Sequence, residues 1–107
     1  MIARLTTYEG QVSPNLDGVR MYDEAAIPWL QDAEGFRGLL VLVDRANRRT
    51  LSLSFWESEE TERQSEEARR RFGELVAEHV GLNREEGEMY EVVLGRGLDI
   101  DGLREDA

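Results

Sequence analysis

Hydrophobic and polar residues alternate at several places along the chain, with the period of two that is typical of half-buried β-strands. Residues 2–8, IARLTTY, form the first such segment and residues 50–56, TLSLSFW, form another. Between them, residues 39–44, LLVLVD, are apolar on both faces, which predicts a central strand covered on both sides. Residues 89–94, MYEVVL, predict the last strand.

Two other segments carry apolar residues at spacings of three and four, as on one side of an amphipathic helix. The first begins at Ser13-Pro14, because serine caps a helix and proline suits its first position, and it extends to Leu30. The second follows Ser58 as its N-cap and extends to Val80. Its inner side is expected to carry Ser65, Ala68, Phe72, Leu75, Val76 and His79, while the acidic run from Glu57 to Glu67 is expected to be solvated.

Short links separate these elements. Gly35 is suited to a left-handed cap of the first helix, with Phe36 as its hydrophobic contact. Residues 45–49, RANRR, predict a hairpin turn in which Asn47 takes the positive φ. In the strand after this turn, Phe55 is expected on the packed side of the sheet.

The order of elements is β-α-β-β-α-β, which is the ferredoxin-like plan of the α+β class: a four-stranded antiparallel sheet with two helices on one face. One domain, residues 1–94, is expected to precede an acidic C-terminal tail, residues 95–107. Two helices cover one face only, yet several strands carry apolar residues on both faces. We therefore expect a homodimer through sheet-to-sheet packing, which forms a dimeric α/β barrel.

Composition excludes several kinds of chemistry. The 107 residues include no cysteine, and all thirteen basic residues are arginine, so thiolate nucleophiles and lysine Schiff bases are excluded. A net charge of −10 argues against nucleic acid as a partner. The longest apolar run, residues 39–43, is too short to cross a membrane, and the N-terminus has no signal-peptide pattern, so a cytoplasmic location is expected.

Two motifs give the sequence a resemblance to a known family: Gly35-Phe36-Arg37-Gly38 before the second strand, and Trp56-Glu57-Ser58 after the third. Over residues 1–94 the chain resembles the antibiotic biosynthesis monooxygenase-like group of the dimeric α/β-barrel superfamily. The resemblance implies two protomers with their sheets face to face and a ligand cavity in each. Some members oxygenate polyketide-derived phenols without metal or flavin, and others degrade haem.

The haem-degrading members differ from this sequence at their functional positions. They use an asparagine on the first strand, where this chain has Thr6 and Thr7. They also use a tryptophan and a proximal histidine on the second helix, at positions that here are Ser65 and Leu75, with His79 one turn further along. These departures argue against haem degradation, and no cofactor is expected.

A cofactor-free oxygenase activates O₂ through a substrate that becomes an anion, so its site must bind a phenol and stabilise the deprotonated form. An arginine, a tryptophan N–H or a tyrosine hydroxyl in an apolar pocket is suited to this role. Substrate contacts are therefore expected from Arg4, Thr6, Ser52, Ser54, Trp56 and Tyr90, and the candidates for a catalytic role are Trp56, His79 and Tyr8.

Each candidate also has a structural explanation. His79 is the single histidine, and it fits the C-terminal dipole of its helix as well as acid–base catalysis. Trp56 shares its parity with two serines and fits either a ligand cavity or a structural anchor. Arg4 fits either a paired interface arginine or an anion-binding group. One histidine and scattered carboxylates predict no metal site.

Two functions follow from this sequence. The first is a cofactor-independent monooxygenase that acts on a small aromatic or otherwise apolar compound. The alternative is a non-catalytic small-molecule-binding or interaction module of the same fold. A ligand cavity that holds convergent arginine or tyrosine side chains favours the first, and a cavity filled by side chains favours the second.

Overall fold

A computed structural model of the protein describes residues 1–10, 19–20, 23–24, 27–80, 83–84 and 87–98. Its elements are β1 (Ile2–Glu9), α2 (Ile27–Gln31), β2 (Phe36–Asp44), β3 (Arg49–Trp56), α3 (Glu59–Val80), β4 (Asn83–Arg84) and β5 (Glu88–Glu91). Residues 19–20 and 23–24 are also helical, whereas the predicted helix start at Ser13 lies outside the described residues.

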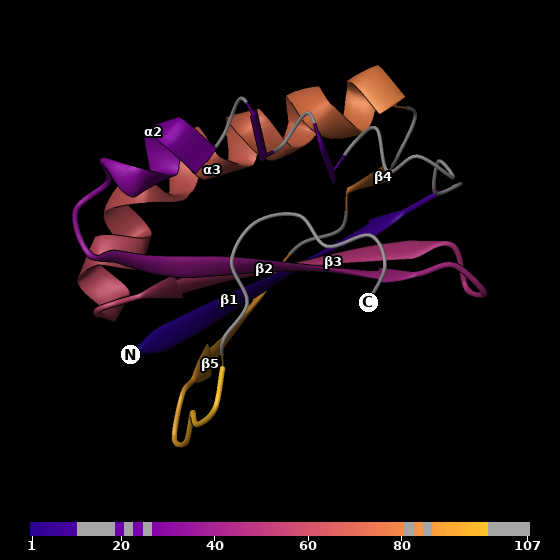
Figure 1. Cartoon of the computed structure of the whole chain (residues 1–107). Helices are drawn as coiled ribbons and strands as arrows, with labels where there is room; N and C mark the ends of the chain where they lie inside the picture. Colours follow the sequence, from indigo (N-terminus) through magenta and orange to yellow (C-terminus); the bar gives the residue numbers. More distant parts are fainter. Residues whose placement is uncertain (11–18, 21–22, 25–26, 81–82, 85–86, 99–107) are drawn as a thin grey trace.

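The strands form one antiparallel sheet in the order β2-β3-β1-β4, and β5 also pairs with β1. Because β2 is the end strand of this order, the prediction that residues 39–44 form a central strand is wrong. Both α2 and α3 lie on the same side of this sheet (Figure 1). The predicted ferredoxin-like α+β architecture is therefore confirmed. The short strands β4 and β5 together take the place of the predicted last strand, but β5 ends at Glu91 rather than Leu94.

The strand register determines which side chains share each face of the sheet. Arg4 lies opposite Ser54 and Thr6 lies opposite Ser52, and residues directly opposite one another point to the same face. Trp56 shares this face and packs against Leu30 of α2, so it is the face that the helices cover. Phe55 therefore lies on the other face and is partly exposed, so the prediction that it belongs to the packed side is wrong.

The corner between β3 and α3 is held by side chains on both sides of it. The Trp56 indole N–H donates to Ser54 Oγ at 2.9 Å, and its ring meets Phe36 edge to face, with the ring centroids 5.5 Å apart. Phe36 belongs to β2, opposite Trp56, rather than to the helix cap. The Thr61 backbone N–H donates to Ser58 Oγ at 3.3 Å, which confirms Ser58 as the N-cap of α3.

The hairpin turn between β2 and β3 is organised by Asp44. Asn47 donates to its carboxylate from both the backbone and the side chain, with the Nδ2–Oδ2 distance 2.8 Å. These bonds, helped by Arg49, lower the pKa of the Asp44 carboxyl. The positive φ of 55° falls on Arg48, so the prediction that Asn47 adopts it is wrong, because Asn47 is held by Asp44.

The segment after β5 projects away from the rest of the domain (Figure 1). Val93 and Leu94 are 86% and 75% exposed there. The predicted domain boundary at residues 94–95 stays a prediction, since only the first four residues of the tail, 95–98, are described. Within the described part of the chain, no helix has the length and apolar character needed to span a membrane.

Gly35 ends the turn after α2 with a φ of 79°, as predicted for a left-handed cap, and it lies against α3. A Cβ atom at this position would be 2.4 Å from the Cβ of Thr61. We expect Gly35→Ala to lower the free energy of unfolding by about 2–4 kcal/mol, because it combines a left-handed backbone with a steric clash. Urea denaturation measures the change.

Gly97→Ala is the matched control, because Gly97 has a similar φ of 73° but no atom within 4 Å of an added Cβ. We expect it to cost at most about 1 kcal/mol. If both variants lose the same stability, Gly35 does not pack closely against α3.

Candidate functional site

The space between the sheet and α3 is rich in buried polar side chains. We call this set the polar layer; besides Arg4, discussed below, its members are Thr6, Thr50, Ser52, Ser54, Glu62 and Ser65. Among the described residues, the largest fully buried apolar side chains are Trp56 and Leu30. Polar groups are costly to bury and are normally retained with hydrogen-bond partners or for a function. The polar layer is therefore the first candidate for a site.

Arg4 crosses the polar layer from β1 to α3. Its Nη1 atom lies 3.3 Å from Glu62 Oε1, and its Nη2 atom lies 3.9 Å from Glu66 Oε1. The side chains of Arg4 and Glu62 are only 13% and 3% exposed, so this is a largely buried ion pair. Glu66 is half exposed and its contact is correspondingly weaker.

The Nε atom of Arg4 is buried and has no acceptor among the residues that the structure describes. Leaving a buried donor unpaired costs about 1–3 kcal/mol. An ordered water, an ion or a bound molecule can supply the missing acceptor of such a group. The Nε–H group is thus the one buried side-chain donor of the described polar layer that lacks a protein acceptor.

Gly87, the residue before β5, lies close to Arg4 and Thr6 of β1. A Cβ atom on Gly87 would lie 3.1 Å from Arg4 Nε, 3.2 Å from Thr6 Oγ1 and 2.6 Å from the Leu5 carbonyl oxygen. Only glycine permits this close approach of the backbone. The edge of the polar layer is therefore formed by backbone rather than by another side chain.

The structure brings most of the predicted substrate contacts together. Arg4, Thr6, Ser52 and Ser54 share the helix-covered face, and Tyr8 is buried on it opposite Thr50. These positions alternate along two adjacent strands, which is why sequence periodicity could group them.

Trp56 lies at the end of the same face, but its role in the structure is that of an anchor. It is completely buried, it packs against Leu30, and its N–H is used by Ser54. Of the other two catalytic candidates, Tyr8 is buried on the same face, and the side chain of His79 in α3 lies outside the described part of the structure.

Tyr90 is not brought together with the other candidates. It pairs with Ala3 in the β1–β5 register, whereas Met89 is the residue opposite Arg4, so Tyr90 points to the opposite face. Tyr90 is 48% exposed, and its hydroxyl donates to Glu88. That hydrogen bond raises the pKa of the Tyr90 hydroxyl, which makes the phenolate form less accessible.

Glu62 is the residue of the polar layer that the sequence pattern missed. It falls in the acidic run that is expected to be solvated, yet it is 2% exposed. One signal was available: Glu62 precedes Ser65 by three residues, so it extends the predicted inner side of α3 by one turn. The charged Arg4 inside a buried strand also required a partner of this kind.

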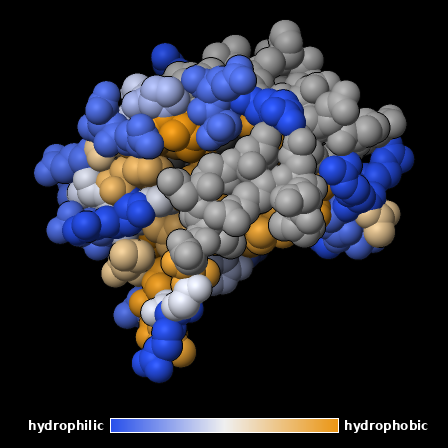
Figure 2. Space-filling view, viewed as in Figure 1, coloured by the Kyte–Doolittle hydropathy of each residue, from blue (hydrophilic) through white to orange (hydrophobic). Residues whose placement is uncertain are grey.

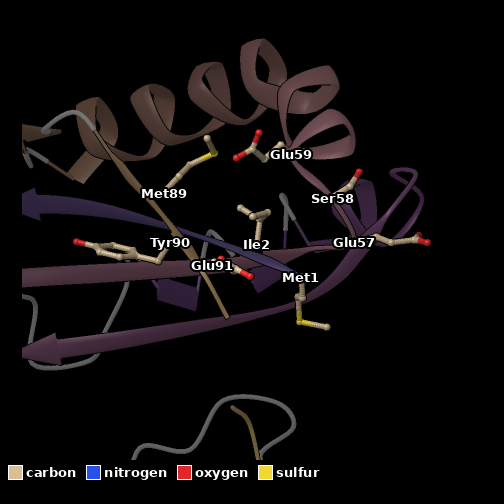
Figure 3. A pocket seen from close by; sticks show the side chains of 8 residues that line it. All are labelled: Met1, Ile2, Glu57, Ser58, Glu59, Met89, Tyr90 and Glu91. Atoms are coloured by element: carbon tan, nitrogen blue, oxygen red, sulfur yellow. The ribbon is translucent and has the colours of Figure 1, made fainter. Parts of the chain in front are cut away.

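A pocket of about 290 Å³ opens beside the polar layer, between the start of α3 and the β1–β5 edge (Figure 3). Its lining residues are Met1, Ile2, Glu57, Ser58, Glu59, Met89, Tyr90 and Glu91. Arg4 is not among them, but Ile2 precedes it by two residues on β1 and Met89 lies opposite it on β5. The pocket therefore lies next to Arg4 along β1 and β5, on the side of Ile2 and Glu91.

Metal coordination has no support in this region. Among the described residues, no three histidine or carboxylate side chains are placed to hold a metal ion. The Arg4–Glu62 pair also uses the one acidic residue that is buried in the described part of the polar layer.

The sequence matches no protein-family model and no curated protein sequence. Solved structures of the same fold include a monooxygenase from the gene ActVA-Orf6 of Streptomyces coelicolor, in complex with nanaomycin D. That structure has a TM-score of 0.64 and 16% identity, over 94% of this chain and 92% of that chain.

Two further structures share the fold. SnoaB, a cofactor-independent oxygenase from Streptomyces nogalater, has a TM-score of 0.63 and 12% identity, over 88% of this chain and 94% of that one. The heme-degrader MhuD from Mycobacterium tuberculosis, with two hemes bound, has a TM-score of 0.61 and 19% identity, over 91% of this chain and all of that one. The chain thus has the fold of the antibiotic biosynthesis monooxygenase-like proteins. At these identities the likeness concerns the fold alone.

Proposed function

We propose that this domain binds a small aromatic molecule in the polar layer between its sheet and α3, and that it oxygenates this molecule without a cofactor. The observation that carries the proposal is the buried Arg4 guanidinium, with an unpaired Nε–H, among hydroxyl side chains. The same fold is found in SnoaB, a cofactor-independent oxygenase.

The proposed reaction converts a phenol and O₂ into a quinone and water. The phenol loses its O–H proton, and the resulting phenolate transfers electrons from the ring to O₂. The ring C–H bond para to the oxygen is then broken, one oxygen atom becomes the new carbonyl, and the other leaves as water. The phenol supplies all four electrons, so the balance needs no further reductant.

Side chains of the polar layer have definite tasks in this proposal. The Arg4 Nε–H donates to the substrate oxygen, where negative charge develops on deprotonation. Glu62, the buried carboxylate beside Arg4, accepts the phenol proton. The transfer keeps the total charge of the layer constant, which avoids the cost of adding a buried charge. The hydroxyls of Thr6 and Ser52 orient the ring.

The pocket at the β1–β5 edge provides the approach to this layer in our proposal. Ile2 and Met89 supply apolar surface beside Arg4, and Figure 3 shows their side chains, with Glu59, in the region between the strands and α3. An aromatic ring is stabilised against such apolar side chains, while its oxygen reaches the polar layer.

A non-catalytic binding module is the second candidate. The pocket favours it, because Arg4 is not among the lining residues, and so does the packing of Trp56. This side chain is completely enclosed and its N–H is already bonded, so it offers nothing to a reacting substrate. A haem-degrading function has no comparable support, because this chain has Thr6 and Thr7, Ser65 and Leu75 where the haem-degrading members use an asparagine, a tryptophan and a histidine.

Oxygen uptake separates the two candidates. We expect the purified protein to consume O₂ with a member of a panel of naphthols and other phenols that have a free C–H para to the hydroxyl, to form the quinone, and to retain the activity after treatment with a chelator. Arg4→Gln should lower kcat by about a hundredfold, as does removal of a donor from other oxyanion sites.

Arg37→Gln is the matched control, since Arg37 is exposed and pairs with Glu57 on the surface at 3.6 Å. It should keep the wild-type rate. Binding of panel compounds without any uptake would leave the non-catalytic module as the function.

We also propose that two copies assemble through the face of the sheet opposite the polar layer. Leu5, Leu40 and Leu53 are aligned across three strands of this face, with Phe55 and Leu42 beside them. These five positions are apolar, and the nearest charged side chain on the same face is Glu88 of β5, which lies opposite Leu5 and borders the proposed interface. Figure 2 shows further apolar surface on the segment that projects after β5.

Sedimentation tests this assembly. We expect a dimer at micromolar concentration, and we expect Leu53→Glu to be a folded monomer by circular dichroism, because it places a carboxylate in the centre of the interface. Arg63→Glu changes the charge more but lies on the exposed side of α3, so it should remain dimeric. A wild-type protein that sediments as a stable monomer would overturn the proposed dimer.

A further inference from the structure

The three nitrogen atoms of the Arg4 guanidinium differ in their partners. Both Nη atoms face carboxylates of α3, at 3.3 Å for Glu62 and 3.9 Å for Glu66, while the buried Nε has no acceptor in the described structure. Glu62 and Glu66 are four residues apart and therefore lie on the same side of α3. These two contacts fix the orientation of the guanidinium, and with it the direction of the Nε–H bond.

The charge of Arg4 is compensated before any ligand binds. Glu62 is almost completely buried, so its interaction with Arg4 is weakly screened by water, whereas that of the half-exposed Glu66 is strongly screened. A ligand that brought its own negative charge to Nε would add an uncompensated charge to a buried region. A neutral oxygen acceptor would use the same donor without that cost.

We infer that the polar layer selects aromatic ligands whose oxygen is neutral when they bind, such as a phenol or an aryl ketone, against aryl carboxylates, and that Glu62 determines this selectivity. The inference rests on the proposed function and specifies the chemistry of its ligand. In this selectivity Glu62 acts through Arg4, by compensating its charge; the acceptance of the phenol proton in the proposed function is a separate role of the same carboxylate.

Two probes of nearly equal shape test the selectivity. At neutral pH, 2-acetylnaphthalene is neutral and 2-naphthoate is an anion, and each presents a carbonyl-type oxygen on the same ring. Binding is measured by equilibrium dialysis or calorimetry with the full chain. We expect the wild type to bind the ketone at least about tenfold more tightly than the carboxylate.

Glu62→Gln releases the positive charge of Arg4 while it keeps the size and hydrogen-bonding ability of the side chain. We expect 2-naphthoate to bind about tenfold more tightly to this variant, with little change for the ketone. Glu66→Gln is the matched control, and its effect on the ratio should be about twofold or less because its contact is longer and exposed. Salt should weaken carboxylate binding to Glu62→Gln more than ketone binding to the wild type.

The outcomes distinguish this inference from the proposed function. Equal affinity of the wild type for both probes would overturn the inference without any variant, so the test does not depend on whether Glu62→Gln folds. A ratio that is unchanged in a folded Glu62→Gln would overturn the role of Glu62. If neither probe binds, the aromatic ligand class itself is wrong, and the inference falls with it. Oxygen uptake with a neutral phenol but equal probe affinities would leave the proposed function standing alone.

Discussion

The ion pair between Arg4 and Glu62 is the interaction on which the space between the sheet and α3 depends. Either charge alone would be unstable in a buried layer, and removal of one partner from such a pair costs about 3–5 kcal/mol. The pair links the central strand β1 to α3 across a separation of 58 residues in the sequence. It also leaves one guanidinium donor, Nε, without a protein acceptor in the described structure. The same interaction therefore contributes to the tertiary structure and leaves the donor that the proposed function assigns to a ligand oxygen.

The two faces of the sheet have different chemistry because of this arrangement. The helix-covered face carries hydroxyl and charged side chains, with Trp56 enclosing one end against Leu30. The opposite face carries leucines and Phe55 in register across β1, β2 and β3. Polar side chains on the helix-covered face can hydrogen-bond a polar ligand. Apolar side chains on the opposite face can be buried against a second copy of the sheet. The proposed ligand binding on one face and the proposed self-association through the other would both follow from one alternating pattern.

Much of the fold follows from local sequence signals. Alternation correctly predicts β1 and β3, serine capping predicts the start of α3, and glycine predicts the left-handed turn at Gly35. Signals of this kind act over a few residues. The end of β5 is different, because its length depends on how far Glu88–Glu91 can pair with β1, and alternation alone extends it to Leu94.

Local sequence signals predict only part of the candidate site. Periodicity grouped Arg4, Thr6, Ser52 and Ser54, but it could not tell which face the helices cover, since that is decided by the packing of α2 against Trp56. Glu62 looked like one more solvated glutamate, because its burial is caused by a partner on a distant strand. Tyr90 was grouped wrongly with the others, because the register of β5 against β1 places it on the opposite face.

The most direct measurement is a nuclear magnetic resonance titration that follows the arginine Nε–H signals of ¹⁵N-labelled protein, assigned with Arg4→Gln and Arg37→Gln. We predict that 2-acetylnaphthalene shifts the Arg4 Nε–H proton downfield, as expected when a buried donor gains an acceptor, while the exposed Arg37 signal stays in place. Binding that shifts other signals but leaves Arg4 Nε–H unchanged would contradict the assignment of the ligand site to the polar layer.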